Sequence, residues 1–246
     1  MPMRETVITI GKRTKLYPLY NKLRRSVYKG AIKRILHIVT CGPFVRGWKI
    51  RQYLRGDGPK KLQVGSGYHT KKGWLNGDLI AGDIYLNATR RFPFPDASFD
   101  YVFAEQFIEH LSFYAGAYCL SECSRVLKRG GKIRLSTPDF ERLYLLYKDQ
   151  NPGVDLKTAM TRHRKNHNLR LTTACHFIND FFRLWGHSFI YDEETLLLHL
   201  GSAGFTNVDR KCFGSSDNPY LRHLEIHADA EWMKNAFQIV LEAEKT

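Results

Sequence analysis

The sequence contains few cysteines, and no two of them stand at the C-x-x-C spacing. Its 246 residues include five cysteines, which is an odd number. A disulfide framework or a thiolate zinc site needs cysteines paired at short spacing, so the sequence argues against both. Unpaired thiols are typical of proteins in a reducing compartment, and we therefore expect a cytoplasmic location.

Long apolar runs, internal repeats and low-complexity tracts are also missing. In the N-terminal part, the longest stretch without formal charge, residues 35–45, contains Gly42 and Pro43. It falls well short of the roughly 20 apolar residues that a membrane-spanning helix needs. With 43% hydrophobic and 25% charged residues, the composition is typical of a globular protein with one principal core.

Acidic residues are almost absent from the first 55 positions. This segment holds 14 Lys or Arg and one acidic residue, and so carries +13 of the net charge of +14. Apolar residues recur there at helical spacing, at Leu16, Tyr20, Leu23 and Val27. We interpret residues 1–58 as a basic, partly helical arm. It would lie on an anionic membrane surface, as a peripheral contact at the inner face, or pack on the core, or bind nucleic acid, the least favoured alternative.

Residues 59–246 alternate short apolar runs with helical patterns. Strands are predicted at 61–65, 99–104, 132–136, 205–212 and 224–228, and helices at 115–127, 141–148, 193–200 and from Glu231 onward. The polar, weakly periodic stretch at about 150–190 is interpreted as an insertion or lid. The alternation predicts an α/β domain with a parallel sheet covered by helices.

A glycine-rich turn follows the first predicted strand. Gly65, Ser66 and Gly67 let the backbone approach a ligand closely. Asp78 lies 13 residues after Gly65, at the end of a second strand, where its carboxylate could accept hydrogen bonds from both hydroxyls of a ribose. Threonine at position 70 breaks the G-x-G-x-x-G pattern and disfavours a nicotinamide oxidoreductase.

Several motifs follow one another in a defined order. They are Leu62-Gln-Val-Gly-Ser-Gly67, Gly73-Trp-Leu-Asn-Gly-Asp78, Phe92-Pro-Phe-Pro-Asp-Ala-Ser-Phe-Asp100, Glu109-His-Leu111, Arg125-Val-Leu-Lys-Arg-Gly-Gly131, Pro138-Asp139, Gly186-His187, Ala203-Gly-Phe205 and Leu224-Glu-Ile-His227. In this order they resemble class I S-adenosylmethionine-dependent methyltransferases, specifically a small branch related to glycan and cell-surface biosynthesis.

The resemblance implies a Rossmann-like, seven-stranded, mostly parallel sheet with helices on both faces, in addition to the basic N-terminal helical arm. It implies S-adenosyl-L-methionine as cofactor, bound by Gly65, Ser66, Gly67, Asp78, Asn87, Ala88, Ala104 and Glu105. Gln63, His69 and Asn87 depart from the family pattern. These departures keep open a cofactor-binding module without turnover.

Methyl transfer to a hydroxyl requires alignment and a base that takes the proton. Candidate bases are His110, Asp139 and His187, with His227 the weaker fourth, because histidine titrates near neutral pH. The competing interpretations are a helix cap for Asp139 and structural or loop roles for the histidines. The sequence does not decide among them.

The predicted insertion is basic. Arg162, Arg164, Lys165 and Arg170 would steer a phosphate or sugar-acid substrate, or form a solvated loop. His163, His167, Cys175 and His176 lie nearby, but their spacing matches no standard zinc pattern. The sequence therefore predicts no metal site.

The function predicted from these features is O-methylation of a sugar or glycan-type acceptor, including lipid-linked ones. Alternatives are C-methylation of a lipid or quinone-like molecule and RNA methylation. Residues 104–107 lack the Asn/Asp-Pro-Pro-aromatic signature of amino-directed base methylation, and no Pro-Cys dipeptide is present, so DNA base methylation is disfavoured. The acceptor, the base and the oligomeric state stay open.

Overall fold

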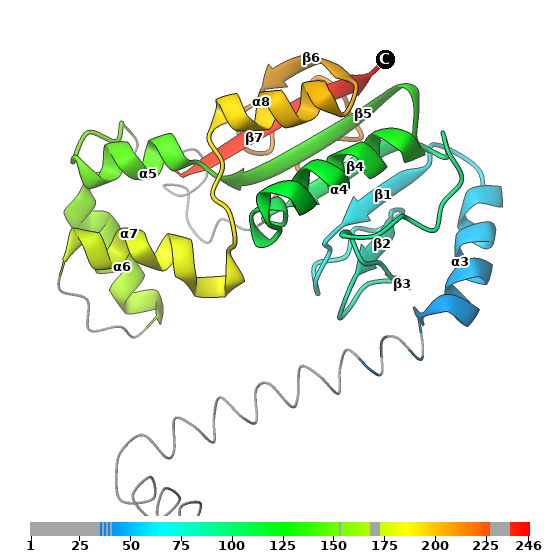
Figure 1. Ribbon diagram of the computed structural model, residues 1–246, viewed down its shortest axis with the longest axis horizontal. Helices are drawn as coiled ribbons and strands as arrows, with labels where there is room; N and C mark the ends of the chain where they lie inside the picture. The colour runs from blue at the N-terminus through cyan, green and yellow to red at the C-terminus, as the bar shows by residue number, and fades with distance from the viewer. Residues whose placement is uncertain are drawn as a thin grey trace, which may run out of the picture.

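The computed structural model describes residues 35, 37, 39, 41–152, 154–167, 173–226 and 237–246. Its centre is a seven-stranded sheet with the order β3-β2-β1-β4-β5-β7-β6 (Figure 1). The strands are β1 (Lys61–Val64), β2 (Leu75–Asp78), β3 (Ile84–Tyr85), β4 (Phe99–Glu105), β5 (Leu127–Pro138), β6 (Phe205–Arg210) and β7 (Gln238–Lys245). Only β7 runs antiparallel to its neighbours, β5 and β6. The Rossmann-like, mostly parallel sheet is therefore confirmed.

The strand order reverses between β1 and β4. The chain moves outward from β1 through β2 to β3 and then returns to place β4 on the other side of β1. In open α/β sheets, ligands bind beyond the carboxyl ends of the strands at such a reversal. The loops after β1, β2 and β4 meet there.

Side chains of the central strand β4 alternate between two faces. Val102 and Ala104 belong to the main core, which also includes residues of α4 (Phe113–Val126) and α8 (Glu193–Ser202). Tyr101 and Phe103 point the other way, toward Trp74 and Leu221. This period of two is the pattern expected of a strand with both faces covered.

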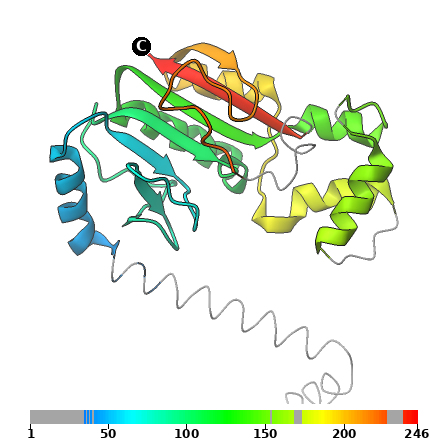
Figure 2. The ribbon, with the colours of Figure 1, turned by 180° about the vertical axis from the view of Figure 1, so that it is seen from behind.

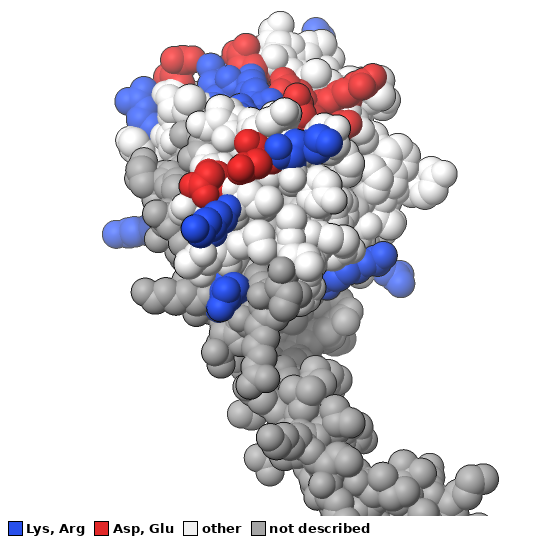
Figure 3. All heavy atoms as spheres, turned by 90° about the vertical axis from the view of Figure 1, so that its left-hand side faces the viewer, with Lys and Arg blue, Asp and Glu red and all other residues white. Residues whose placement is uncertain are grey.

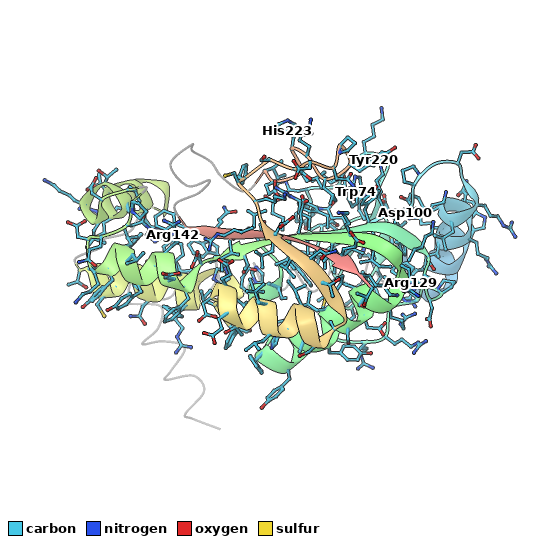
Figure 4. All side chains as sticks on the ribbon, turned by 90° about the horizontal axis from the view of Figure 1, so that it is seen from above. Trp74, Asp100, Arg129, Arg142, Tyr220 and His223 are labelled. Carbon is cyan, nitrogen blue, oxygen red and sulfur yellow. The ribbon has the colours of Figure 1, made fainter. Side chains whose placement is uncertain are left out.

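The second face is covered by the irregular segment 211–226, which crosses the sheet in Figure 2. Figure 4 shows Trp74, Tyr220 and His223 together on the side opposite α8. The fully buried Arg134 guanidinium holds this segment by pairing with the carboxylates of Glu225 and Glu242. Removing one member of such a buried ionic cluster would leave a buried charge unpaired, which is strongly destabilising. The cluster therefore fixes the segment on the sheet.

Helix α3 (Pro43–Arg55) packs at the β3 edge of the sheet. Ile50 lies in the main core, and Lys49 Nζ donates to the carbonyl of Asp83 (2.7 Å). The Tyr53 hydroxyl donates to the carbonyl of Lys61 in β1 (2.9 Å). Residues that the sequence assigns to the arm are thus part of the folded domain.

A small helical unit extends beyond the carboxyl end of β5 (Figure 1). It contains α5 (Phe140–Tyr147), α6 (Leu156–His167), α7 (Ala174–Arg183) and the 3-10 turn η2 (Leu184–Gly186). Leu143, Phe177 and Phe181 form its separate core, and His163 Nε2 bonds to Asp180 Oδ2 between α6 and α7 (3.0 Å). In the described residues, the predicted insertion at about 150–190 therefore contains two helices, α6 and α7. Acidic and basic side chains lie next to one another on the end of the molecule that carries this unit (Figure 3).

Most predicted elements within 59–226 are confirmed within a few residues, but two predictions at the C-terminal end differ. The tail helix is wrong for residues 238–245, which form β7 between β5 and β6. Residues 224–226 are not in a strand, and 227–236 lie outside the described residues, as do residues 1–34 of the arm. Within the described ranges, no helix combines the length and apolar character needed to cross a bilayer.

Candidate functional site

The glycine turn and Asp78 meet at the strand reversal. Gly67 N–H donates to Asp78 Oδ2 (3.0 Å), and the N–H groups of Gly65 and Ser66 donate to the carbonyl of Gly77 (2.9 and 3.2 Å). The turn after β1 is thus bonded to the end of β2. Asp78 is only partly buried, so its carboxylate stands at the edge of the sheet beside the turn.

The two glycines have different surroundings. Both adopt positive φ, 70° at Gly65 and 49° at Gly67. A side chain at Gly65 would collide with the ring of Phe107, whereas one at Gly67 would meet open space. Glycine at 65 therefore accommodates the Phe107 ring, and the backbone at 67 is the part of the turn that a ligand can approach.

Gln63 departs from the family pattern and yet supports this turn. Its side-chain amide donates to the carbonyl of His69 (3.1 Å), near the end of the loop that begins at Gly65. The carboxamide therefore stabilises the loop by a neutral hydrogen bond.

The residues after β3 form a tight turn. Asn87 Oδ1 accepts from the N–H (3.0 Å) and the hydroxyl (2.8 Å) of Thr89, and Ala88 is buried. The Asn87 oxygen is thus engaged locally.

Ala104 and Glu105 end β4 but point in opposite directions. Ala104 is in the main core, whereas Glu105 Oε1 accepts from the N–H of Ile226 (2.6 Å) on the other face. The structure therefore gives Glu105 a part in anchoring the segment 211–226. Gln106, the next residue, has a φ of 47°, and its buried Nε2 has no hydrogen-bond partner among the described residues. Such strained backbone is concentrated at functional sites.

The structure brings His110 and His187 together from segments 77 positions apart in the sequence (187 − 110). Their ring centroids are 5.0 Å apart, in an edge-to-face arrangement. His110 ends the 3-10 turn η1 (Ile108–His110), which follows β4, and His187 follows η2. Glu109 lies next to them, fully buried, and its Oε2 accepts from the hydroxyl of Thr137 (3.0 Å).

Burial lowers the pKa of both histidines. For His110 the carbonyls of Gly186 and Gln106 and the charge of Asp78 partly offset that effect. For His187 the carbonyl of Phe181 offsets it, and proximity to His110 adds to the lowering. Both imidazoles are therefore biased to the neutral form, which has a nitrogen lone pair.

Asp139 is engaged elsewhere. Its Oδ1 accepts from the N–H of Arg142 and caps α5 (3.2 Å), and its Oδ2 pairs with the guanidinium of Arg210 (2.9 Å). Because both oxygens are used within the fold, we do not retain Asp139 as a base. His227 lies outside the described residues.

A cavity of about 330 Å³ is lined in part by Ser188 and Phe189, which follow His187 in the chain. Phe140, Phe182 and Phe189 give it an aromatic surface, and Ser188, Asp192 and Thr195 are its polar lining. Cavities of this size and character are typical of small-molecule sites.

The sequence did not single out Glu109, Gln106 or Phe107 as site residues. Their position directly after β4, flanking the predicted His110, is the signal that could have identified them, because loops after parallel strands converge at the reversal.

Residues 65–135 match the family model described as a methyltransferase domain. This stretch runs from the glycine turn into β5 and contains every predicted cofactor-binding residue. The match supports the predicted methyltransferase class and S-adenosylmethionine as its cofactor.

Known proteins resemble the chain weakly. Phosphoethanolamine N-methyltransferase 2 of Haemonchus contortus, solved with S-adenosyl-L-methionine, is 13% identical with a TM-score of 0.46, over 85% of this chain and 54% of that one. A SAM-dependent methyltransferase from Archaeoglobus fulgidus is 16% identical with a TM-score of 0.45, over 82% and 92%. An uncharacterised 37.1 kDa transposon protein of Streptomyces fradiae is 30% identical over 86 residues, which are 35% of this chain and 23% of that protein. The strand order, and not these likenesses, establishes the fold.

Proposed function

We propose that this protein is an S-adenosylmethionine-dependent methyltransferase that methylates an oxygen of a sugar or glycan-type acceptor, including lipid-linked glycans. The observation that carries the proposal is the hydrogen bond from the Gly67 N–H to Asp78 at the strand reversal, inside the stretch that matches a methyltransferase domain. The acceptor class is supported by the resemblance of the motifs and by the basic arm.

The residues at the reversal fit the proposed cofactor. The backbone at Gly67 borders open space, and each Asp78 oxygen accepts one backbone N–H, which leaves further lone pairs for the hydroxyls of a ribose. Two hydroxyls on one carboxylate fix the orientation of the nucleoside. Bound there, S-adenosylmethionine supplies an electrophilic methyl group on a sulfonium.

The acceptor then belongs on the β4 side of this turn. Ser188 and Phe189, which follow His187 in the chain, line the cavity, and the Ser188 hydroxyl donates to the backbone carbonyl of His110 (3.1 Å). The aromatic side chains offer an apolar surface to the acceptor, and the pair of imidazoles assists the loss of the acceptor's hydroxyl proton. Alignment of the acceptor with the methyl group supplies much of the rate enhancement.

The aromatic lining favours C-methylation of a lipid or quinone-like molecule as the second candidate. Three phenylalanines and Ile190 offer an apolar surface. The position of the two histidines favours an oxygen acceptor over this alternative, because a hydroxyl has a proton to lose.

Calorimetric titration with S-adenosylmethionine and with S-adenosylhomocysteine tests the cofactor. We expect saturable binding of both at one site per chain. Labelled methyl transfer is then measured into glycan, lipid and RNA fractions, and we expect label in the glycan fraction. Label only in apolar lipids would support the second candidate, and no binding of either nucleoside would refute the proposal.

A further inference from the structure

We infer that Glu109, His110 and His187 form a binding site for a divalent transition-metal ion. One carboxylate oxygen and two imidazole nitrogens, one atom from each residue, all lie within 4.8 Å of one another. In a tetrahedral site with bonds of about 2.0–2.2 Å, the ligand atoms are about 3.3–3.6 Å apart. Side-chain rotations would therefore bring all three within bonding distance of a single ion.

The imidazole of His187 is oriented as a metal ligand should be. Its Nδ1–H donates to the carbonyl of Phe181 (2.6 Å), which fixes the tautomer and leaves the lone pair on Nε2. Histidines that bind metals usually donate their other ring N–H to a carbonyl or carboxylate in this way.

Backbone hydrogen bonds hold the two ligand-bearing segments together. The N–H groups of Ser188 and Phe189 both donate to the carbonyl of Glu109 (2.7 and 3.1 Å). The hydroxyl of Ser188 donates to the carbonyl of His110 (3.1 Å). The residues flanking all three ligands are thus tied to each other before any ion binds, which is the preorganisation that a metal site requires.

Glu109 contributes the negative charge. Its side chain is fully buried, and the Thr137 hydroxyl donates to one of its oxygens. A hydrogen bond of this kind orients a ligating carboxylate. Because the interior has a low dielectric constant, a buried carboxylate attracts a cation more strongly than an exposed one does.

The ligand set selects the class of ion. Two imidazoles and one carboxylate suit Zn²⁺, Mn²⁺ or Fe²⁺, whereas Mg²⁺ and Ca²⁺ prefer oxygen ligands throughout. Three protein ligands leave at least one coordination position open. The role of the ion rests on the proposed function. With both imidazoles as ligands, the ion would replace them as the group that assists proton loss: an acceptor hydroxyl at the open position would lose its proton to solvent more readily, because a bound divalent ion lowers the pKa of the oxygen it holds.

The test uses the full chain after treatment with a chelator and exchange into chelator-free buffer. Calorimetric titration with ZnCl₂ and with MnCl₂ should show one saturable site per chain. Glu109→Gln and His187→Gln should each weaken Zn²⁺ binding by at least about tenfold. His176→Gln is the matched control, because its half-exposed imidazole lies in α7 outside the trio, and it should bind as the unmodified chain does.

A second measurement needs no variant. Zn²⁺ should shift the ring nitrogen NMR signals of two of the ten histidines. Absence of saturable binding would overturn the site. Equal affinity in all three variants would also overturn it and would identify an adventitious ion only. S-adenosylmethionine is titrated separately into metal-free protein. Cofactor binding without metal binding would refute this site alone, and metal binding without cofactor binding would refute the proposed function alone.

Discussion

Asp78 is the residue on which cofactor affinity should depend most directly. Its oxygens accept from Gly67 N–H (3.0 Å) and Ile80 N–H (2.8 Å), and their remaining lone pairs face the proposed ribose site. Asp78→Ala removes charge-assisted hydrogen bonds. We expect S-adenosylmethionine binding to weaken by about 1.5–3 kcal/mol, measured by calorimetric titration.

The matched control is Asp57→Ala, which removes an exposed carboxylate from the turn before β1. It should leave cofactor affinity unchanged, and circular dichroism of both variants establishes that they fold. Undiminished affinity in the Asp78 variant would mean that the ribose binds elsewhere.

The sequence predicts where some site residues lie relative to the strands, but it does not predict which way their side chains point. Gly67 and Asp78 meet as their positions after two neighbouring strands predicted. Glu105 follows the same rule, yet the period of two in β4 directs it to the opposite face, toward Ile226. The contact of His110 with His187 depends on the path of α7 and η2, which no local pattern encodes.

At the scale of elements, α3 contributes to the main core, which the sequence does not predict. Ile50 is 5% exposed within the main core, while Trp48 on the same helix is 58% exposed. Ile50→Ala should lower the free energy of unfolding by about 2–5 kcal/mol, because it leaves a cavity in the core. Trp48→Ala should change it by about 0.5 kcal/mol or less.

Urea denaturation followed by circular dichroism measures both variants. Similar stability in the two would contradict the packing of α3 on the sheet. The basic composition of α3 is typical of the N-terminal arm, because charge reports the exposed face of a helix and says little about the buried one.

The element that the sequence misjudged most clearly is β7. Gln238–Lys245 contains Glu242, Glu244 and Lys245, which are more typical of helices than of strands. The structure places this strand between β5 and β6, where Glu242 pairs with the buried Arg134. Tertiary pairing therefore overrides local propensity. By contrast, β1 and β4 are apolar runs ending at turn signals, so their local and global preferences agree.

At the scale of the whole molecule, the two signs of charge are distributed unequally along the chain. Residues 56–246 carry 24 basic and 23 acidic side chains, so nearly all of the excess is in the first 55 positions. Where the folded domain is seen from the end that carries α5–α7, both signs occur side by side (Figure 3). A basic field strong enough to dock the molecule on an anionic surface must therefore come from the N-terminal segment.

This distribution predicts that the N-terminal segment binds anionic membranes. Each basic side chain near such a surface contributes about 1 kcal/mol. Changing Lys22, Arg24, Arg25 and Lys29 to glutamine in the full chain should reduce binding to phosphatidylserine vesicles by roughly a thousandfold in a sedimentation assay.

The matched control changes four exposed basic residues of the folded domain, Lys72, Arg90, Arg129 and Lys157, and should leave most binding intact. Equal losses in the two variants would show that net charge alone governs the attraction, and unchanged binding in the first would refute membrane binding by the N-terminal segment.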